Sequence, residues 1–554
     1  MSSQPSPGRP LVGSQRLLIG VLVVLGLGIL VVGLYWGSRL RRVESSPPEQ
    51  PVEASAVSGK QLFGRYCAPC HGEKGDGNGP AARFLYPKPR NFGEAKFRLA
   101  SALNGIPSDD DLMRVITRGM PGSAMFPFGH LAEDERRALV GEVRSLIHSA
   151  TTDRVKTESA ERGEPLEGAE LVEIVNDLTT LGQPFEIPSD LPASSPESVA
   201  RGQALYRAAC VGCHGEKGKG DGVQDQRDAN GMPTRPRDFT RGIFKGGREP
   251  ERLYARIRFG MPGTPMPSSL QYTPEQMGDM VSFILSLSDP SAQGRVEHKR
   301  QRLVAKTSPK PINGSDSDDL WRTVEAVPIV VSPLWWRNYD EPELRVAALH
   351  DGDTLAIRFT WRDATRDDSP VRPQDFDDMA AVQLFKGKPE PFLGMGDANG
   401  ALDVWLWRAR WLTDADVDSA YPNMAVDIYP LEKTGAGARP HAAANQPPEF
   451  LTARAAGNLT ADTAGDIRGS DLQAKGFGTL TMRPRVSQDV RSSGSWKDGG
   501  WTVVFRRPMH VKDNGGISLS PGDKLSVAFA IWDGSAGDRN GQKLVSIWHD
   551  LELE

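Results

Sequence analysis

The chain has 554 residues with a formal net charge of −5, and 38% of its residues are apolar. At roughly 150 residues per domain, this length predicts three or four domains. So small a net charge excludes the strongly basic composition of nucleic-acid-binding proteins. The 58 glycines and 43 prolines indicate loop-rich domains with small cores.

An uncharged run of 20 residues, 17–36, lies near the N-terminus. As a helix it would be about 30 Å long, the thickness of the hydrocarbon core of a bilayer. The run ends in Tyr35-Trp36, and three arginines follow it, where a cleaved signal peptide would have small residues. We expect a cytoplasmic segment at 1–16, a transmembrane anchor at 17–36 and a linker at 37–57. The flanking arginines alone favour the opposite orientation, by a single charge.

Two C-x-x-C-H motifs, which begin at Cys67 and Cys210, use all four cysteines of the chain. In this motif both thiols bond to haem vinyl groups, and the histidine becomes an axial ligand of the iron. A zinc site would need four ligands per metal, and a thioredoxin-like motif needs no following histidine. The sequence therefore predicts two covalent haem c groups, held by Cys67, Cys70, His71, Cys210, Cys213 and His214.

The surroundings of the two motifs are repeated along the chain. The matching segments are 59–67 and 202–210, 89–92 and 236–239, and 119–125 and 260–266. Each copy opens with a helix that runs into the motif and closes with an amphipathic helix pattern, at 133–147 and 274–287. We expect two copies of one all-α domain, at 58–150 and 198–288.

Charge runs flank the second copy. Residues 153–177 carry eight acidic and three basic side chains, and residues 295–310 carry five net positive charges. Such runs are typical of solvated linkers, so we expect an acidic linker at 151–197 and a basic linker at 289–317. The alternative is that they dock partners of opposite charge.

The chain changes character after about residue 318. Apolar and polar residues alternate in 354–362, and similar runs at 501–505 and 525–531 are separated by Gly, Asp, Asn and Pro. This period is typical of half-buried strands. We expect a mainly-β, antiparallel sandwich at 318–554.

The ordered helix, C-x-x-C-H motif, loop, methionine turn and closing helix resemble class I cytochrome c domains. The resemblance implies a methionine sulfur as the sixth iron ligand, Met125 in the first copy and Met266 in the second. Met120 and Met261 in the same turns are the alternatives, and packing against the haem edge is the other role for each methionine. His/Met ligation favours ferrous iron and blocks small molecules, as in an electron carrier.

A Pro-Arg-x-Phe element occurs in both copies. Its arginines, Arg90 and Arg237, could hold haem propionates through bidentate hydrogen bonds. Two ordinary surface arginines are the alternative.

The C-terminal region resembles the haem-binding gamma subunits of ethylbenzene dehydrogenase and dimethylsulfide dehydrogenase. The resemblance rests on 330–336, 359–365, 403–407, and 532–543 leading to 546–548. It implies a β-rich domain that holds a haem b between a methionine and a lysine and passes electrons for a molybdenum enzyme.

Met395 matches the family methionine, whereas the expected lysine after Trp405-Leu-Trp407 is replaced by Arg408. A guanidinium has no free lone pair and cannot ligate iron. Another ligand is then needed, or the domain has become a docking module without haem. The histidine candidates are His350, His441, His510 and His549.

These features predict a membrane-anchored dihaem cytochrome c on the periplasmic side of the bacterial inner membrane. It would transfer electrons between a respiratory-chain component and a redox partner, such as a molybdenum oxidoreductase with its iron–sulfur subunit, without being an enzyme itself. A dihaem peroxidase and a haem sensor or structural subunit are the alternatives. A peroxidase needs an open iron site, which the paired methionines argue against.

Overall fold

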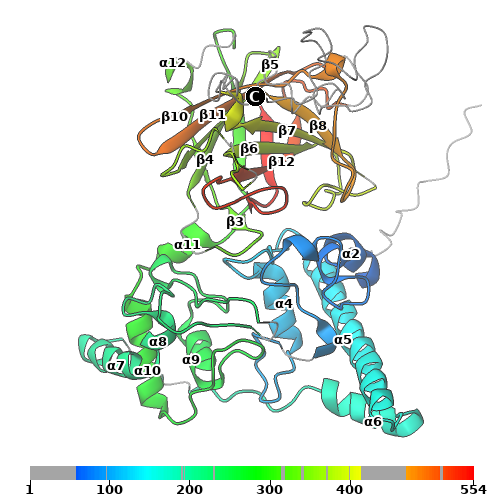
Figure 1. The fold of residues 1–554 in the computed structure, drawn as a ribbon, viewed down its shortest axis with the longest axis vertical. Helices are drawn as coiled ribbons and strands as arrows, with labels where there is room; N and C mark the ends of the chain where they lie inside the picture. The colour runs from blue at the N-terminus through cyan, green and yellow to red at the C-terminus, as the bar shows by residue number, and fades with distance from the viewer. Residues whose placement is uncertain are drawn as a thin grey trace, which may run out of the picture. The chain divides into compact units, whose positions relative to one another are not determined.

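The computed structural model describes most of the chain beyond the predicted anchor (Figure 1). The described residues are 58–554, apart from 95–96, 189–190, 192–193, 229–230, 313–317, 338–341, 370–371, 373, 399, 413–468 and 512–515. They fall within a single unit of the fold. The predicted anchor at 17–36 lies outside them, and within the described ranges no helix is both long and apolar enough to cross a membrane.

The first repeat is helical, as predicted. Its elements are α2 (Gly59–Tyr66), α3 (Ala68–His71), η1 (Ala82–Phe84), η2 (Phe92–Glu94), α4 (Asp109–Arg118) and α5 (Glu133–Glu161). Ser58 and Gln61 form a capping box that starts α2. Helix α2 contacts α5 at Gly59, where a Cβ atom would lie 2.1 Å from the carbonyl oxygen of Ala138. Only glycine allows the two backbones to approach so closely.

The second repeat has the same plan. Its elements are α7 (Pro196–Ala209), α8 (Val211–His214), η3 (Phe239–Arg241), α9 (Pro250–Phe259) and α10 (Pro274–Ser286), with α11 (Ala292–Val296) following. Helix α7 meets α10 at Gly202, where a Cβ atom would lie 1.9 Å from the carbonyl oxygen of Asp279. Tyr206 and Met277 are fully buried beside this crossing. The repeat in the sequence is therefore a repeat of helix packing.

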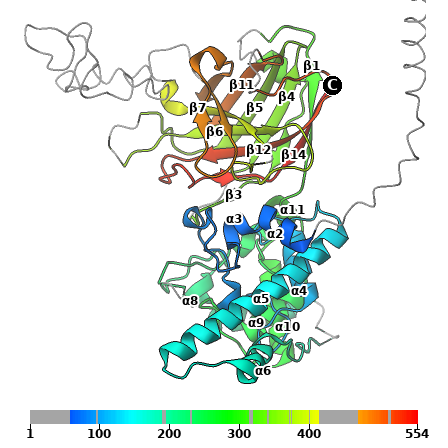
Figure 2. The same ribbon diagram turned by 90° about the vertical axis from the view of Figure 1, so that its right-hand side faces the viewer.

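The acidic segment between the repeats is not simply a linker. Helix α5 begins at the predicted residue but runs well beyond the predicted end (Figure 2). Its Val155 packs in a buried cluster with Leu171 and Val175 of α6 (Gly168–Thr179). The acidic side chains occupy the exposed faces of these helices. Because they outnumber the few buried apolar residues, the sequence did not indicate that the segment packs as helices.

The C-terminal region, the β domain, is rich in strands. They are β1 (Arg302–Thr307), β2 (Val327–Ile329), β3 (Ser332–Pro333), β4 (Leu344–His350), β5 (Thr354–Arg362), β6 (Met379–Phe385), β7 (Leu402–Arg408), β8 (Ser470–Ala474), β9 (Thr481–Met482), β10 (Arg491–Trp496), β11 (Gly500–Pro508), β12 (Lys524–Trp532), β13 (Leu544–Val545) and β14 (His549–Leu553). Short helical turns also occur, α12 (Asp318–Trp321), η4 (Ala409–Trp411) and η6 (Arg485–Ser487). The main path of strands is β10-β11-β5-β4-β1-β14-β12-β6-β7-β8-β9.

Strand β1 joins the two halves of this path. Residues 302–305 pair with β14 and residues 306–307 pair with β4, both in parallel, whereas the other strand pairs recorded among the described residues are antiparallel. The sequence placed these residues in a basic linker and predicted only antiparallel pairing. Leu303 and Ala305 are buried and alternate with less buried residues. The strand is short and many of its neighbours are charged, so this pattern was not recognised in the sequence.

The two halves of the sheet face each other over one core, as expected of a sandwich. Phe359 of β5 and Phe529 of β12 are in contact, with ring centroids 5.3 Å apart. Every residue of β12 after Lys524 is buried, although only its alternate residues belong to this core. Ala528, Ala530 and Trp532 lie in separate apolar clusters. The outer face of β12 is therefore covered as well.

Candidate functional site

The first C-x-x-C-H motif lies where α2 meets α3, and Cys67, Cys70 and His71 all line one cavity of about 1280 Å³. The Nδ1 atom of His71 lies 3.1 Å from the carbonyl oxygen of Arg90. Donation from Nδ1–H to this oxygen leaves Nε2 with the lone pair that a metal needs. Phe92 stacks on the imidazole with ring centroids 5.0 Å apart. The hydrogen bond and the stacked ring therefore fix the orientation of the imidazole, with Nε2 able to bind a metal.

The second motif repeats the stacking of a phenylalanine on the histidine but not the hydrogen bond at Nδ1. Phe239 stacks on His214 with ring centroids 4.7 Å apart. Burial lowers the pKa of His214 to about 4, so its imidazole is neutral at pH 7. Its buried Nδ1 has no hydrogen-bond partner among the described residues. A neutral imidazole in this position can serve as a metal ligand.

The four cysteines form no disulfide bond. Burial raises the pKa of Cys67 and of Cys70 to about 12 and that of Cys210 to about 11, and it also raises the pKa of Cys213. Each motif supplies two thiols and one histidine, fewer than the four ligands of a structural zinc site. The donor set agrees better with thioether bonds to haem.

In each methionine turn, the two candidates for the sixth iron ligand lie close together. Met120 and Met125 line the cavity, and the Met120 N–H donates to the Met125 carbonyl at 2.8 Å. Gly119 begins the turn with a φ of 70°, which favours glycine. In the second repeat, the Met261 N–H donates to the Met266 carbonyl at 3.2 Å. The choice of Met125 and Met266 as ligands stays a prediction.

The same cavity continues to the outer face of the β domain. There it is lined by Ala381 of β6, Leu406 of β7, and Ala528, Ala530 and Trp532 of β12. The three alanines leave space above the sheet. Ordinary small-molecule sites occupy roughly 300–1000 Å³, so this cavity exceeds the usual size of a single site.

Met395 lies in this part of the cavity. Its φ of 75° is one of few positive values at a non-glycine residue in the described chain. Such a backbone costs roughly 1–2 kcal/mol and tends to occur at functional sites. Gly394 and Gly396 flank it, and the Gly476 N–H donates to its carbonyl at 2.7 Å. The loop is thus held so that the predicted methionine reaches the cavity.

Lys543 lines the same cavity and was missed as a ligand by sequence reasoning. Burial lowers its pKa to about 8. Its ammonium lies 4.7 Å from the centre of the Trp532 ring, and within the described chain it makes no hydrogen bond or ion pair. A lysine that readily loses its proton can offer an amine lone pair to iron. The signal was present in the sequence, because 532–543 is one of the motifs that carry the family resemblance.

Arg408, which occupies the place where the lysine was expected, has a different role. Its Nε and Nη2 donate to the two oxygens of the buried Asp377 at 2.9 and 2.6 Å. A guanidinium engaged in this way is not a metal ligand, as predicted. The lysine that lines the cavity in the described part of this domain lies further along the chain, at residue 543.

Family models match the chain in the order of its domains. The cbb3-type cytochrome c oxidase subunit III model matches residues 54–141, the cytochrome c model matches 199–288, and the ethylbenzene dehydrogenase model matches 318–544. The chain joins two cytochrome c domains to an ethylbenzene dehydrogenase-type domain. The resemblances drawn from the C-x-x-C-H repeats and from the C-terminal motifs are therefore confirmed.

Three relatives are similar to part of the chain. A putative respiratory nitrate reductase heme subunit from Haloferax mediterranei is 25% identical over 239 residues, which are 42% of this chain and 66% of that protein. The gamma subunit of chlorate reductase from Ideonella dechloratans is 27% identical over 213 residues, 38% of this chain and 65% of that protein. The gamma subunit of dimethylsulfide dehydrogenase from Rhodovulum sulfidophilum is 26% identical over 245 residues, 42% of this chain and 72% of that protein.

The chain spans just under two thirds of the length of the first two relatives. Together with the family matches, the similarities support an electron-transfer haem protein. The cytochrome c domains imply covalent haem c, and the thiols, histidines and cavity described above fit that group.

None of the histidine candidates in the described part of the ethylbenzene dehydrogenase-type domain, His350, His510 and His549, lines the cavity. His350 Nε2 is bonded to the carbonyl oxygen of Glu554 at 2.8 Å. His549 Nδ1 accepts the N–H of Gln301 at 3.0 Å. His510 is exposed, and His441 lies outside the described residues.

His298 does line the cavity, and sequence reasoning missed it. Its Nε2 lies 2.8 Å from the hydroxyl oxygen of Ser332, and its ring contacts Phe126 with centroids 5.2 Å apart. Burial lowers its pKa to about 4. It belongs to the basic segment after the second repeat, where no motif marks it.

Both predicted propionate arginines lie close to the c-type sites. Arg90 lines the cavity and pairs with Glu94 at 3.5 Å. Arg237 occupies the matching place in the second domain, two residues before the phenylalanine that stacks on the haem-ligand histidine. The guanidinium groups of both arginines extend to the opposite cytochrome c domain.

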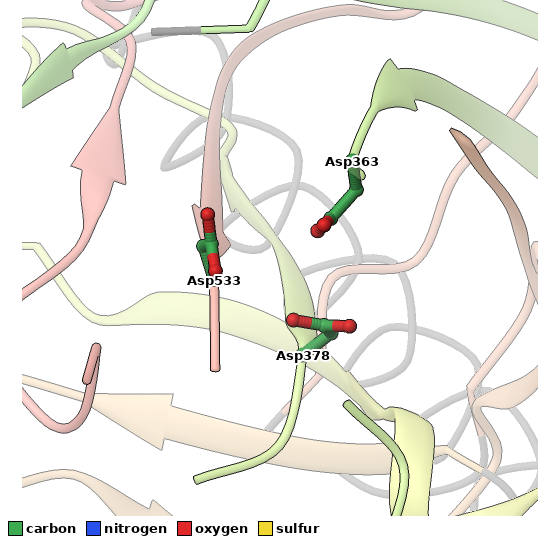
Figure 3. Close-up of side chains that lie close together, drawn as sticks. All are labelled: Asp363, Asp378 and Asp533. Atoms are coloured by element: carbon green, nitrogen blue, oxygen red, sulfur yellow. The ribbon is translucent and has the colours of Figure 1, made fainter. Parts of the chain in front are cut away.

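A cluster of three carboxylates lies at the strand ends of the ethylbenzene dehydrogenase-type domain (Figure 3). Asp363 follows β5, Asp378 precedes β6 and Asp533 follows β12, and the antiparallel pairing of β6 with β12 brings the last two together. The oxygens of Asp378 already accept N–H groups from Gly534, Asp367 and Trp501. Burial, and then the charge of Asp363, raise the pKa of Asp378 to about 8. The three N–H donors act in the opposite direction and lower this pKa.

Proposed function

We propose that this protein is the electron-transfer subunit of a periplasmic oxidoreductase complex, anchored in the membrane through 17–36. It would carry two haem c groups and one haem b. It would connect a respiratory-chain component to a redox partner, with a molybdenum oxidoreductase and its iron–sulfur subunit as the expected partners. Similarity to subunits of nitrate reductase, chlorate reductase and dimethylsulfide dehydrogenase supports this proposal.

One observation carries the proposal. A single cavity of about 1280 Å³ is lined by haem c ligands from the first cytochrome c domain and by Met395 and Lys543 from the β domain. No layer of protein separates the two sets of candidate ligands. Two cofactors in one cavity would lie close enough to exchange electrons without a further carrier.

The chain's residues would keep both axial sites of each iron closed. His71 and a methionine of the 119–125 turn would hold one group, and Met395 and Lys543 would hold the other. Phe92 fixes the orientation of His71, and the apolar walls keep water away. When bound, the three haems supply one-electron redox centres.

The proposal predicts electron transfer within a single molecule. After a flash in which photoexcited flavin reduces one centre, the c-type and b-type absorbances should equilibrate in a first-order phase whose rate is independent of protein concentration. The K543A variant serves as the matched control, since it should lack this phase. A rate proportional to protein concentration would mean transfer between molecules, and it would contradict the proposed relay.

A further inference from the structure

The two cytochrome c domains exchange arginines across their junction. Arg118, at the end of α4, donates to the carbonyl oxygens of Lys245 and Phe244 in the second domain, at 2.9 and 3.1 Å. Arg256, from α9 of the second domain, donates to the carbonyl oxygens of Arg98 and Ala100 in the first. Helices α4 and α9 are the matching helices of the two repeats. The junction is thus reciprocal, with each domain anchored on the same loop of the other.

The arginines of the two Pro-Arg-x-Phe elements also cross the junction between the domains. Nη1 of Arg90 lies 3.3 Å from where a Cβ atom on Gly263 would be, inside the methionine turn of the second domain. Cζ of Arg237 lies 3.4 Å from the Cβ position of Gly122, inside the methionine turn of the first domain. Each arginine therefore leaves the proximal side of its own haem site and reaches the distal turn of the other.

Two further cations complete this group. Burial, and then the charges of Arg90 and Arg237, lower the pKa of Arg98 to about 10. Burial also lowers the pKa of Lys245, with Arg237, Arg98 and Arg90 as additional causes. Arg98 and Lys245 are thus each close enough to feel the charges of Arg90 and Arg237, and the four side chains come from both domains.

The carboxylates recorded beside this group are Glu94, which pairs with Arg90 at 3.5 Å, and Asp228, which stabilises the charge of Arg98. Among the described residues, Lys245 makes no side-chain hydrogen bond or ion pair, and the buried Nε of Arg98 has no hydrogen-bond partner. Buried cations without partners are costly unless an anion joins them. Planar guanidinium groups are suited to bidentate binding of carboxylates.

We propose that Arg90, Arg98, Arg237 and Lys245 form one cationic site, shared by the two domains, that binds the propionates of both c-type haems. This inference rests on the proposed function, because it needs both haems in place. Each domain then completes the haem site of the other. The charge of any one of these residues acts on both irons.

The test is a potentiometric titration of the full chain carrying Arg90→Gln, followed at the c-haem absorbance. Loss of a positive charge stabilises the ferric state, so the midpoint potential should fall. With a shared site, the whole of the c-haem absorbance change should move to lower potential. The reciprocal variant Arg237→Gln should do the same, and Arg90→Lys should restore the original curve in large part.

The control is Arg137→Gln, which removes an exposed arginine of the same domain whose side chain is 70% accessible. Its titration should match the unmodified chain. If Arg90→Gln moves only half of the absorbance change, Arg90 serves its own domain alone and the inference is wrong, while the electron-transfer function stands. An unmodified chain without redox-active haem would instead refute the proposed function itself.

Discussion

The variant Lys543→Ala is expected to lose the non-covalent haem while keeping both covalent ones. Among the described residues of the β domain, Lys543 is the one lysine that lines the cavity with Met395, and its pKa of about 8 makes the neutral amine accessible. Loss of an outer-shell partner usually lowers metal affinity by roughly 10–100-fold, and loss of a direct ligand should cost more. The measurement is the ratio of b-type to c-type haem in the purified variant.

The matched control is Lys524→Ala, which removes an exposed lysine of β12 that pairs with Glu552 at 3.2 Å. It should keep its full complement of haem. In the unmodified protein, a proton competes with iron for the Lys543 amine below a pH of about 8. The dissociation constant for haem b should therefore rise as the pH falls, by about tenfold per unit. Haem b retention by the alanine variant would exclude Lys543 as a ligand.

Met125→Leu is expected to remove the sulfur-to-iron absorption band of the first cytochrome c domain. Leucine fills a similar volume but has no lone pair, so the iron would lose its sixth ligand. The ferrous protein should then bind carbon monoxide at one of its two c-type haems. Its midpoint potential should fall, because a thioether ligand favours ferrous iron.

Met120→Leu provides the comparison, since Met120 lines the same cavity in the same turn. It should leave the band intact and the iron closed to carbon monoxide. The opposite result, with the band lost in Met120→Leu and kept in Met125→Leu, would exchange the roles of the two residues. The same pair of variants at Met266 and Met261 tests the second domain.

The helical repeats were predictable because their signals are local. The C-x-x-C-H spacing is imposed by the porphyrin, and Gly59 and Gly202 mark the helix crossings in the sequence itself. Helix α5 exceeded its predicted end because the buried side chains of its second half pack on α6, a contact between distant residues. In the charged segment after residue 147, too few residues are buried for the sequence pattern to predict this packing.

The candidate site in the β domain was predictable only in part. Met395 followed from its motif, whereas Lys543 lies near the end of the chain and reaches the cavity only through the pairing of β12 with β13 and β6. The contacts of Arg90 and Arg237 with the opposite domain were also hidden. Each arginine fits its own domain in the sequence, and only the packing of the two repeats shows where its guanidinium lies.

The most direct test of the account is the haem content of the purified full-length protein, measured as the pyridine haemochrome spectrum, which separates b-type from c-type haem. The cavity shared by His71, Met395 and Lys543 predicts one c-type and one b-type haem. The second C-x-x-C-H motif adds another c-type haem, so each chain should carry two c-type haems and one b-type haem. Two c-type haems with no b-type haem would contradict the three-centre relay and leave the β domain as a docking module.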